Sequence, residues 1–475
     1  MSHNTPEHFH QQAKEALADK ELRQNFRGAM DYLRGKRRDA FPDPAEEKAV
    51  RDRAEAIRQR CLSKLPELLE KLEQNLQRNG IAVHWAQNAD EANEIFSALA
   101  KQHQAKLMVK GKSMVSEEIG LNHFMEKHGV RCLESDMGEY IVQLDGDTPS
   151  HIIMPAIHKN KQQVSDTFEH NLSDFQPTTD VDRLIQTGRN ALRKAYQEAE
   201  IGVSGVNFAV AETGTLCLVE NEGNGRMCTT IPKVHVAITG IEKVVEFLSD
   251  VPPLYSALTR SATGQNITTY FNMISSPRKD GELDGPEEVH LILLDNGRTQ
   301  AYHDNELRKT LQCIRCGACM NHCPVYTRIG GHAYGTVYPG PIGKIISPHL
   351  MGIDSTQNLI TASSMCGACE EVCPVRIPIP SLLQRLRQES KHNAEPKHDP
   401  LNGQNAAHNT LESAAMKGFA FAATHPTFYH AGLNAARKMN GMIPEHLGSW
   451  TQCRVKPKLA KTSLKAKLAK RQGGK

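Results

Sequence analysis

The sequence predicts an α/β domain with a mainly parallel sheet, followed by a small cysteine-rich module, with helical segments at both ends. Three observations predict this order. Apolar residues recur at helical spacing up to residue 79, short apolar strands alternate with helices from residue 80 to about 300, and seven cysteines fall in two runs between residues 313 and 373. At 475 residues the chain is too long for one core, so several domains are expected.

Residues 1–79 are expected to form an amphipathic helical arm. Apolar side chains are spaced three or four residues apart from Val50 to Leu76. Pro66 should kink or divide this arm, because proline lacks the amide hydrogen that a helix interior needs. Gly80 should cap its carboxyl end.

The next region, residues 80–300, alternates between strands and helices. Asn88 and Glu91 form a capping-box pattern for a helix through Ala100, and a later helix should end near Gly129. Such alternation predicts parallel strands with helices on both faces of the sheet. We expect strands at residues 81–86, 106–109, 130–134, 152–155, 234–238 and 289–294.

Three turns in this region draw attention. The first turn contains Lys110, Lys112 and Ser113 and precedes a helix, where unpaired backbone N–H groups favour an anion. Its glycine spacing is not that of a Walker loop. The alternative is a capped surface turn without a ligand. The pair Asn224–Gly225 predicts a β-hairpin. Glu212 follows an apolar strand, where a carboxylate can serve chemistry or simply form a turn. No G-x-G-x-x-G follows a strand, so no dinucleotide site of the Rossmann type is expected.

The cysteine runs carry the strongest signal in the chain. Residues 313–324 read C-x2-C-x2-C-x3-C-P, the spacing with which bacterial ferredoxins hold 4Fe-4S clusters, and a second run spans residues 366–374. In this pattern the last cysteine of each run serves the other cluster. Cluster 1 is therefore assigned to Cys313, Cys316, Cys319 and Cys373, and cluster 2 to Cys323, Cys366 and Cys369.

Zinc and disulfides are the alternatives to iron-sulfur clusters. Zinc needs only four ligands and has no use for a third cysteine or for the prolines that end both runs. A disulfide framework would call for a secreted chain, and the first residues show no signal peptide. Two 4Fe-4S clusters are the cofactors expected.

The second run departs from the full pattern at Ser363, where a complete run would have its first cysteine. Three arrangements of cluster 2 are then open: a 3Fe-4S cluster, a 4Fe-4S cluster with the Ser363 alkoxide as fourth ligand, or one with an open fourth iron. A serine hydroxyl is far less acidic than a thiol, so we favour a labile fourth iron.

Glycine and proline dominate residues 330–343, which we expect to form a compact loop that carries Tyr334 and Tyr338 over a cluster. An amphipathic helix is expected at 381–392 and a polar linker at 394–409. The tail at 454–475 has nine basic residues and no acidic one, which is typical of a disordered segment; a weak hold on an acidic partner or a membrane surface is the alternative.

Composition limits the setting in which the protein works. The net charge of +3 is small for this length, which argues against nucleic acid as a partner. No apolar stretch approaches the length of a membrane span, so we expect a cytoplasmic protein with at most peripheral membrane association. A reducing cytosol also suits thiols and clusters.

Several motifs taken together resemble the lactate utilisation protein B family over nearly the whole chain. They are VKGKSMVSEEIG (109–120), ESDMGEYI (134–141), PAIHK (155–159), FAVAETG (208–214) and CIRCGACMNHCP (313–324). The resemblance implies a LUD-type domain at 80–300 with a NagB/RpiA/CoA-transferase-like fold, a 4Fe-4S ferredoxin-type domain at 301–392, and a helical C-terminal segment at 393–475.

The resemblance also implies a function. Members of this family work with a cysteine-rich protein A and a LUD-type protein C in oxidising L-lactate to pyruvate, and the B protein carries electrons. We therefore expect an iron-sulfur electron-transfer subunit and assign catalysis to no side chain. Two alternatives are a CoA- or acyl-transferase with Glu212 as nucleophile and regulatory clusters, and a ferredoxin-like subunit of another respiratory oxidoreductase.

Overall fold

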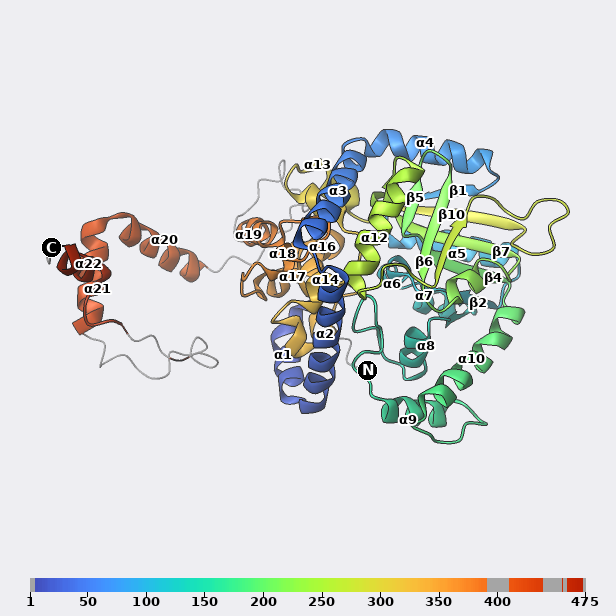
Figure 1. Cartoon of the computed structure of the whole chain (residues 1–475), viewed down its shortest axis with the longest axis horizontal. Coiled ribbons are helices and arrows are strands. Elements are labelled where there is room, and N and C mark those ends of the chain that lie inside the picture. Colours follow the sequence, from blue (N-terminus) through green and yellow to red (C-terminus); the bar gives the residue numbers. More distant parts are fainter. Residues whose placement is uncertain (1–4, 391–409, 439–454, 456–458, 473–475) are drawn as a thin grey trace. The chain divides into compact units, whose positions relative to one another are not determined.

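The computed structural model describes residues 5–390, 410–438, 455 and 459–472. These residues belong to two compact units, 1–406 and 407–475. The first unit contains the helical arm, two sheets and the cysteine-rich module (Figure 1).

The helical arm is present as predicted. Its α-helices are α1 (Phe9–Ala18), α2 (Lys20–Ala40), α3 (Pro44–Ser63) and α4 (Leu65–Arg78), after a 3-10 turn η1 (Pro6–His8). Pro66 lies in the first turn of α4, where proline is tolerated, and the helical arm is divided into α3 and α4 just before this residue. Gly80 follows α4 in the left-handed conformation, with a φ of +86°.

The main sheet has six strands, and every pairing in it is parallel. Their order is β1 (Ala82–Ala86), β10 (Glu288–Leu294), β7 (Val234–Gly240), β4 (Ile201–Gly205), β2 (Leu107–Lys110) and β3 (Arg131–Glu134). The predicted parallel sheet is thereby confirmed. Strand β4 was not predicted, because Gly202, Ser204 and Gly205 give it a low strand propensity.

Helices cover both faces of this sheet. One face packs on α5 (Ala89–Gln102), α6 (Met114–Glu118) and α7 (Leu121–Lys127), which share an apolar core with β4, β7 and β10. The other face packs at its β2–β3 end on α8 (Met137–Leu144), α9 (Lys161–Asn171) and α10 (Val181–Glu198). The helix expected to end near Gly129 is two helices, because Gly120 separates α6 from α7 with a φ of +63°.

A second sheet has the strand order β8 (Val244–Val245), β5 (Phe208–Val210), β6 (Thr215–Glu220) and β9 (Tyr270–Ile274). β5 and β6 form the hairpin of this region. The hairpin predicted at Asn224–Gly225 is wrong, since these residues begin a short helix, α11 (Asn224–Cys228). The Glu220 carboxylate accepts the N–H groups of Gly225 (2.6 Å) and Arg226 (2.7 Å) and so caps that helix.

The strand predicted at residues 152–155 is also wrong. This segment is irregular, and its backbone bonds locally: the Nδ1 atom of His151 accepts the N–H groups of Ile153 (3.0 Å) and Met154 (3.2 Å). Pro155, which has no N–H group to offer a sheet, ends the segment.

The cysteine-rich module is helical and shares one apolar core with the arm and the second sheet. Figure 1 shows α1 and α2 in dark blue beside its orange helices. The expected loop at 330–343 contains a 3-10 turn and the start of α16, and the predicted helix at 381–392 is present as α19. The remaining elements of this unit are η2 (Ile241–Lys243), η3 (Leu248–Asp250), α12 (Val251–Ala262), α13 (Arg298–His303), η4 (Leu307–Gln312), α14 (Ala318–Asn321), α15 (Tyr326–Ile329), η5 (His332–Tyr334), α16 (Gly340–Met351), α17 (Ile353–Thr361), α18 (Ala368–Glu371) and α19 (Ile379–Glu389).

The second unit contains α20 (Thr410–Thr424), α21 (Pro426–Lys438) and α22 (Leu464–Gln472). The tail was expected to be disordered, but α22 lies within it, and the Ser463 hydroxyl caps that helix by accepting the N–H group of Ala466 (3.1 Å). The predicted linker at 394–409 lies outside the described residues. Within the part of the chain that the structure describes, no helix is long and apolar enough to cross a membrane.

Candidate iron-sulfur sites and an adjoining cavity

Four cysteines from the two separate runs line one small cavity of about 20 Å³. They are Cys313, Cys316, Cys319 and Cys373, the set assigned to cluster 1. Burial and the neighbouring Cys373 thiol raise the pKa of Cys316 to about 12. Four convergent sulfur donors fit a 4Fe-4S cluster, whose iron ions would hold these thiols deprotonated.

The two runs share one unusual backbone conformation. Arg315 and Gly317 have φ values of +61° and +73° in the first run, and Met365 and Gly367 have +56° and +83° in the second. A left-handed backbone at a non-glycine residue costs about 1–3 kcal/mol, so it persists only where the surrounding structure requires it. In each run the turn leads into a short helix, α14 or α18, that carries the next cysteine.

Two of the three cysteines assigned to cluster 2, Cys366 and Cys369, are only partly shielded from solvent, whereas Cys323 is buried. Burial, with a smaller contribution from the Cys323 thiol, raises the pKa of Cys369 to about 12. Cys366 is exposed. The buried Lys344 amine lies over the Tyr334 ring. Burial lowers the pKa of Lys344, and the Cys323 and Cys369 thiols oppose that shift. Tyr334 is fully buried.

Ser363 occupies the place in the second run that Cys313 occupies in the first. The Cys313 Sγ atom accepts the N–H group of Arg315 over 3.3 Å, and the Ser363 Oγ atom accepts the N–H group of Met365 over 3.2 Å. The hydroxyl therefore stands in the equivalent turn, two residues before a residue of left-handed conformation.

Arginines of the helical arm bind the backbone of the second run and of the residues just before the first run. Arg51 donates to the carbonyls of Cys373 (3.1 Å) and Glu370 (3.3 Å), and Arg37 donates to that of Val372 (3.4 Å). The buried Arg58 donates to four carbonyls, those of Glu242, Val244, Leu311 and Gln312. Sequence reasoning missed these arginines, because only the fold brings residues so far apart in the chain into contact.

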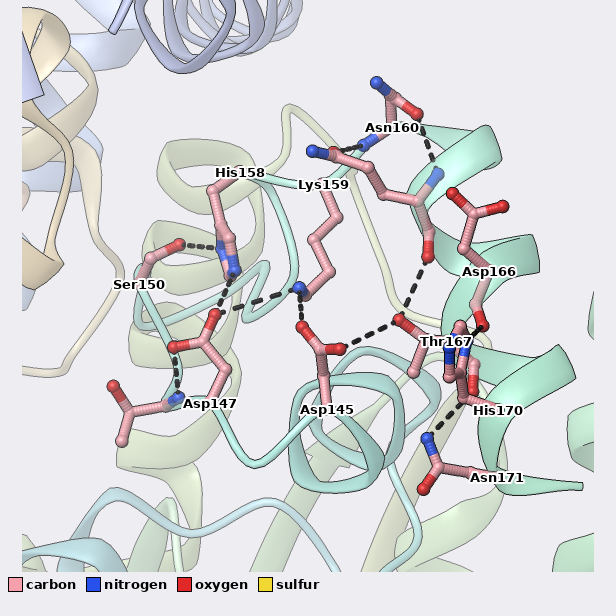
Figure 2. A network of polar contacts seen from close by, with 12 residues as sticks. Asp145, Asp147, Ser150, His158, Lys159, Asn160, Asp166, Thr167, His170 and Asn171 are labelled. Carbon is pink, nitrogen blue, oxygen red and sulfur yellow. Dashed lines mark hydrogen bonds and ion pairs between the residues drawn. The ribbon is translucent and has the colours of Figure 1, made fainter. Parts of the chain in front are cut away.

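Residues 145–160 of the α/β domain are fixed by side-chain hydrogen bonds and contact the first cysteine run. Figure 2 shows His158 between Ser150, at 2.7 Å from its Nδ1 atom, and Asp147, at 2.9 Å from its Nε2 atom. The Tyr326 hydroxyl donates to the Ser150 carbonyl over 2.6 Å. His151 bonds through Nε2 to Asn321 inside the first run (2.9 Å), and burial lowers the pKa of this histidine to about 4.

A larger cavity, of about 260 Å³, lies where β2, β3 and β4 end. It contains Lys112 and Ser113, two of the three residues predicted as an anion site. Ile152 and Arg315 line both this cavity and the small one between the cysteines. A molecule bound in the larger cavity would therefore be separated from cluster 1 by single side chains.

Lys110, the third residue of the predicted anion site, does not belong to it. Its side chain is buried, and its amine contacts Ser116 (2.9 Å), Glu117 (2.5 Å) and Glu134 (2.6 Å). Although burial opposes it, Glu117 and Glu134 raise the pKa of Lys110 well above its usual range. The alternation of the strand explains the error, because it turns Lys110 inwards at the end of β2.

Glu212 does not line the larger cavity. It is exposed in the turn between β5 and β6, and its carboxylate accepts the N–H group of Leu248 over 2.9 Å. This position gives no support to an acyl transfer that uses Glu212 as the nucleophile, because such a reaction needs an enclosed substrate.

Comparison with known proteins matches three family models along the chain: a LUD domain at residues 69–294, a 4Fe-4S dicluster domain at 309–377 and a lactate utilisation protein B C-terminal region at 385–473. Lactate utilization protein B of Bacillus velezensis is 42% identical over 427 residues, covering 89% of this chain and 87% of that protein. The chain belongs to the lactate utilization protein B family. The Bacillus subtilis member is 40% identical over 476 residues, 98% of this chain and 96% of that protein.

A further relative is an Escherichia coli protein described as the uncharacterized electron transport protein YkgF. It is 40% identical over 442 residues, which cover 93% of this chain and 88% of that protein. The family predicted from the motifs is thus confirmed. A LUD domain with a parallel α/β sheet, followed by a 4Fe-4S domain, is the architecture of this chain.

Proposed function

We propose that this chain is the iron-sulfur electron-transfer subunit of a cytoplasmic complex that oxidises L-lactate to pyruvate. The observation that supports it most directly is the convergence of four cysteines from two runs on one cavity, in a chain of this family. We assign one 4Fe-4S cluster to these cysteines and a second to Cys323, Cys366 and Cys369, with Ser363 nearby. The partners proposed are homologues of the cysteine-rich protein A and the LUD-type protein C.

The fold of the LUD domain is proposed to be of the NagB/RpiA/CoA-transferase type. A six-stranded parallel sheet covered by helices on both faces supports this assignment. The ligand site of such open sheets lies at the carboxyl ends of the strands, which is where the larger cavity lies here.

The bound clusters would accept and release electrons one at a time, and the protein has to place and shield them. Tyr334 is buried, as are four of the cysteines, Cys316, Cys319, Cys323 and Cys373. The N–H group of Arg315 bonds to a cluster 1 sulfur, an interaction that tunes the potential of such centres. Because Cys366 is exposed, electrons would pass to or from a partner at the cluster 2 end.

The test uses the complex purified anaerobically with its natural partners. L-lactate is added, and the reduced clusters are detected by EPR, with D-lactate as the control for specificity. We expect reduction in the complex and none in the isolated chain. Reduction of the isolated chain would place lactate oxidation within it. Failure of L-lactate to reduce the clusters of an intact complex would contradict the proposal and favour a subunit of another respiratory oxidoreductase.

A further inference from the structure

Two buried cations stand between the larger cavity and the cluster 1 cysteines. Arg315 donates through Nη2 to Glu242 over 3.3 Å, but its Nη1 atom is buried and has no hydrogen-bond partner among the described residues. Lys243 donates to the Cys313 carbonyl over 3.4 Å, a long hydrogen bond. Both side chains line the cavity and are about nine-tenths buried.

The buried charges around these two residues do not balance. The two carboxylates present each pair with a guanidinium: Glu118 and Glu242 both bond to Arg298, and Glu242 also bonds to Arg315. Arg58 adds a third guanidinium against these two carboxylates, and the Lys243 amine adds a fourth basic side chain. Buried charges are normally paired, so these basic groups need further anions in addition to the two carboxylates. The cluster 1 thiolates supply negative charge on one side, and the cavity is open to an anion on the other.

The rest of the cavity suits a small organic anion. Lys112 adds a third cation, and Ser113 adds a hydroxyl group. The three acidic groups in its wall already accept backbone N–H groups: Glu220 caps α11, Asp136 caps α8, and Glu222 accepts the N–H group of Met137 over 3.0 Å. Apolar side chains of Ile152, Val206 and Leu258 complete the wall and would contact a short carbon chain.

We propose that this cavity binds a small organic carboxylate against Arg315 and Lys243, and that its binding is coupled to the redox state of cluster 1. An electron added to cluster 1 places negative charge beside the same two cations, so the anion should bind the reduced protein less tightly. By linkage, a bound anion then lowers the reduction potential by the equivalent amount. The coupling rests on the proposed function, whereas the binding site does not.

The binding test titrates pyruvate into the anaerobic, cluster-loaded protein by calorimetry, with sulfate as a second probe. We expect pyruvate to bind, and Lys243→Met and Arg315→Gln to weaken binding at least tenfold. Lys233→Met, which changes an exposed lysine outside the cavity, is the matched control and should leave the affinity unchanged. Iron content is measured for each variant, and Lys112→Met serves where Arg315→Gln loses iron. No binding of pyruvate, or binding that these variants do not alter, would overturn the site; sulfate binding as tightly as pyruvate would overturn its preference for an organic anion.

The coupling test is a redox titration of cluster 1 with and without saturating pyruvate. A tenfold weaker affinity in the reduced state corresponds to a potential lowered by about 59 mV. The shift should vanish in Lys243→Met. Binding without any shift would overturn the coupling. Loss of binding while L-lactate still reduces the clusters of the complex refutes only this site, and intact binding without that reduction refutes only the proposed function.

Discussion

Arg298 and Glu118 form a two-armed ion pair in the interior, with Nη1–Oε1 and Nη2–Oε2 distances of 2.8 and 2.9 Å. Glu118 ends α6 of the α/β domain, and its Oε2 atom also accepts the hydroxyl group of Tyr338 (2.8 Å) from the cysteine-rich module. One carboxylate therefore fixes the orientation of a buried arginine and joins the two domains.

This geometry predicts unequal effects of two substitutions. Glu118→Gln removes one of the two carboxylates that pair with the buried Arg298, which should cost about 3 kcal/mol because Glu242 still pairs with it. Tyr338→Phe removes one hydrogen bond and should cost about 1 kcal/mol. Thermal unfolding followed by circular dichroism under anaerobic conditions compares them, and equal losses of stability would contradict the role given to the pair.

Crossed ligation predicts that the last cysteine of each run belongs to the other cluster. Cys373→Ser should abolish the EPR and Mössbauer signals of cluster 1 and lower the iron content by roughly four atoms, although the substitution lies in the second run. Cys323→Ser should instead remove cluster 2. If each substitution affected the cluster of its own run, the assignment made from the small cavity would be wrong.

The hydroxyl at position 363 predicts a labile iron in cluster 2. In air the wild-type centre should lose one iron and give a 3Fe-4S signal, because serine is a poor ligand until it is deprotonated. Ser363→Cys places a thiol in a turn that already has the geometry of Cys313, so it should keep all four irons. EPR and Mössbauer spectra before and after brief oxidation report this difference. A wild-type centre as resistant as the variant would show that no vacancy exists.

Glu139 predicts a pH-dependent stability. Burial and the neighbouring Glu134 raise its pKa well above the usual range, so the folded state keeps a proton that the unfolded chain loses near pH 4.3. Stability should therefore fall by about 1.4 kcal/mol per pH unit from there up to the raised pKa. Glu139→Gln should remove that slope, whereas Glu126→Gln on the surface should retain it. Unfolding midpoints at about pH 5 and about pH 7 provide the measurement, and identical slopes in all three proteins would refute this origin.

The elements that local pattern controls were predictable, and those that depend on distant contacts were not. The Pro66 break and the capped helix after Asn88 follow from nearby residues. The Asn224–Gly225 hairpin was mispredicted because the Glu220 carboxylate stabilises a helix there, and residues 152–155 because the His151 ring satisfies their backbone. In the site, the cysteine ligands could be predicted from their spacing. Lys243 and Arg315 could not be predicted as ligand-binding residues, because only the fold places them on one cavity wall.

The four hydrogen bonds of Arg58 bear on how this protein can be divided. Its guanidinium, carried by the arm, reaches carbonyls of the LUD domain at Glu242 and Val244 and others immediately before Cys313. A fragment cut at a boundary between these regions would lose hydrogen bonds to a charged group, each contributing about 1.5–3 kcal/mol, and would expose the apolar core that these regions share. The sequence suggests consecutive, separable domains. We expect, however, that the ferredoxin-type domain of this chain would not fold without the helical arm, so a fusion protein that uses this domain would have to include the arm.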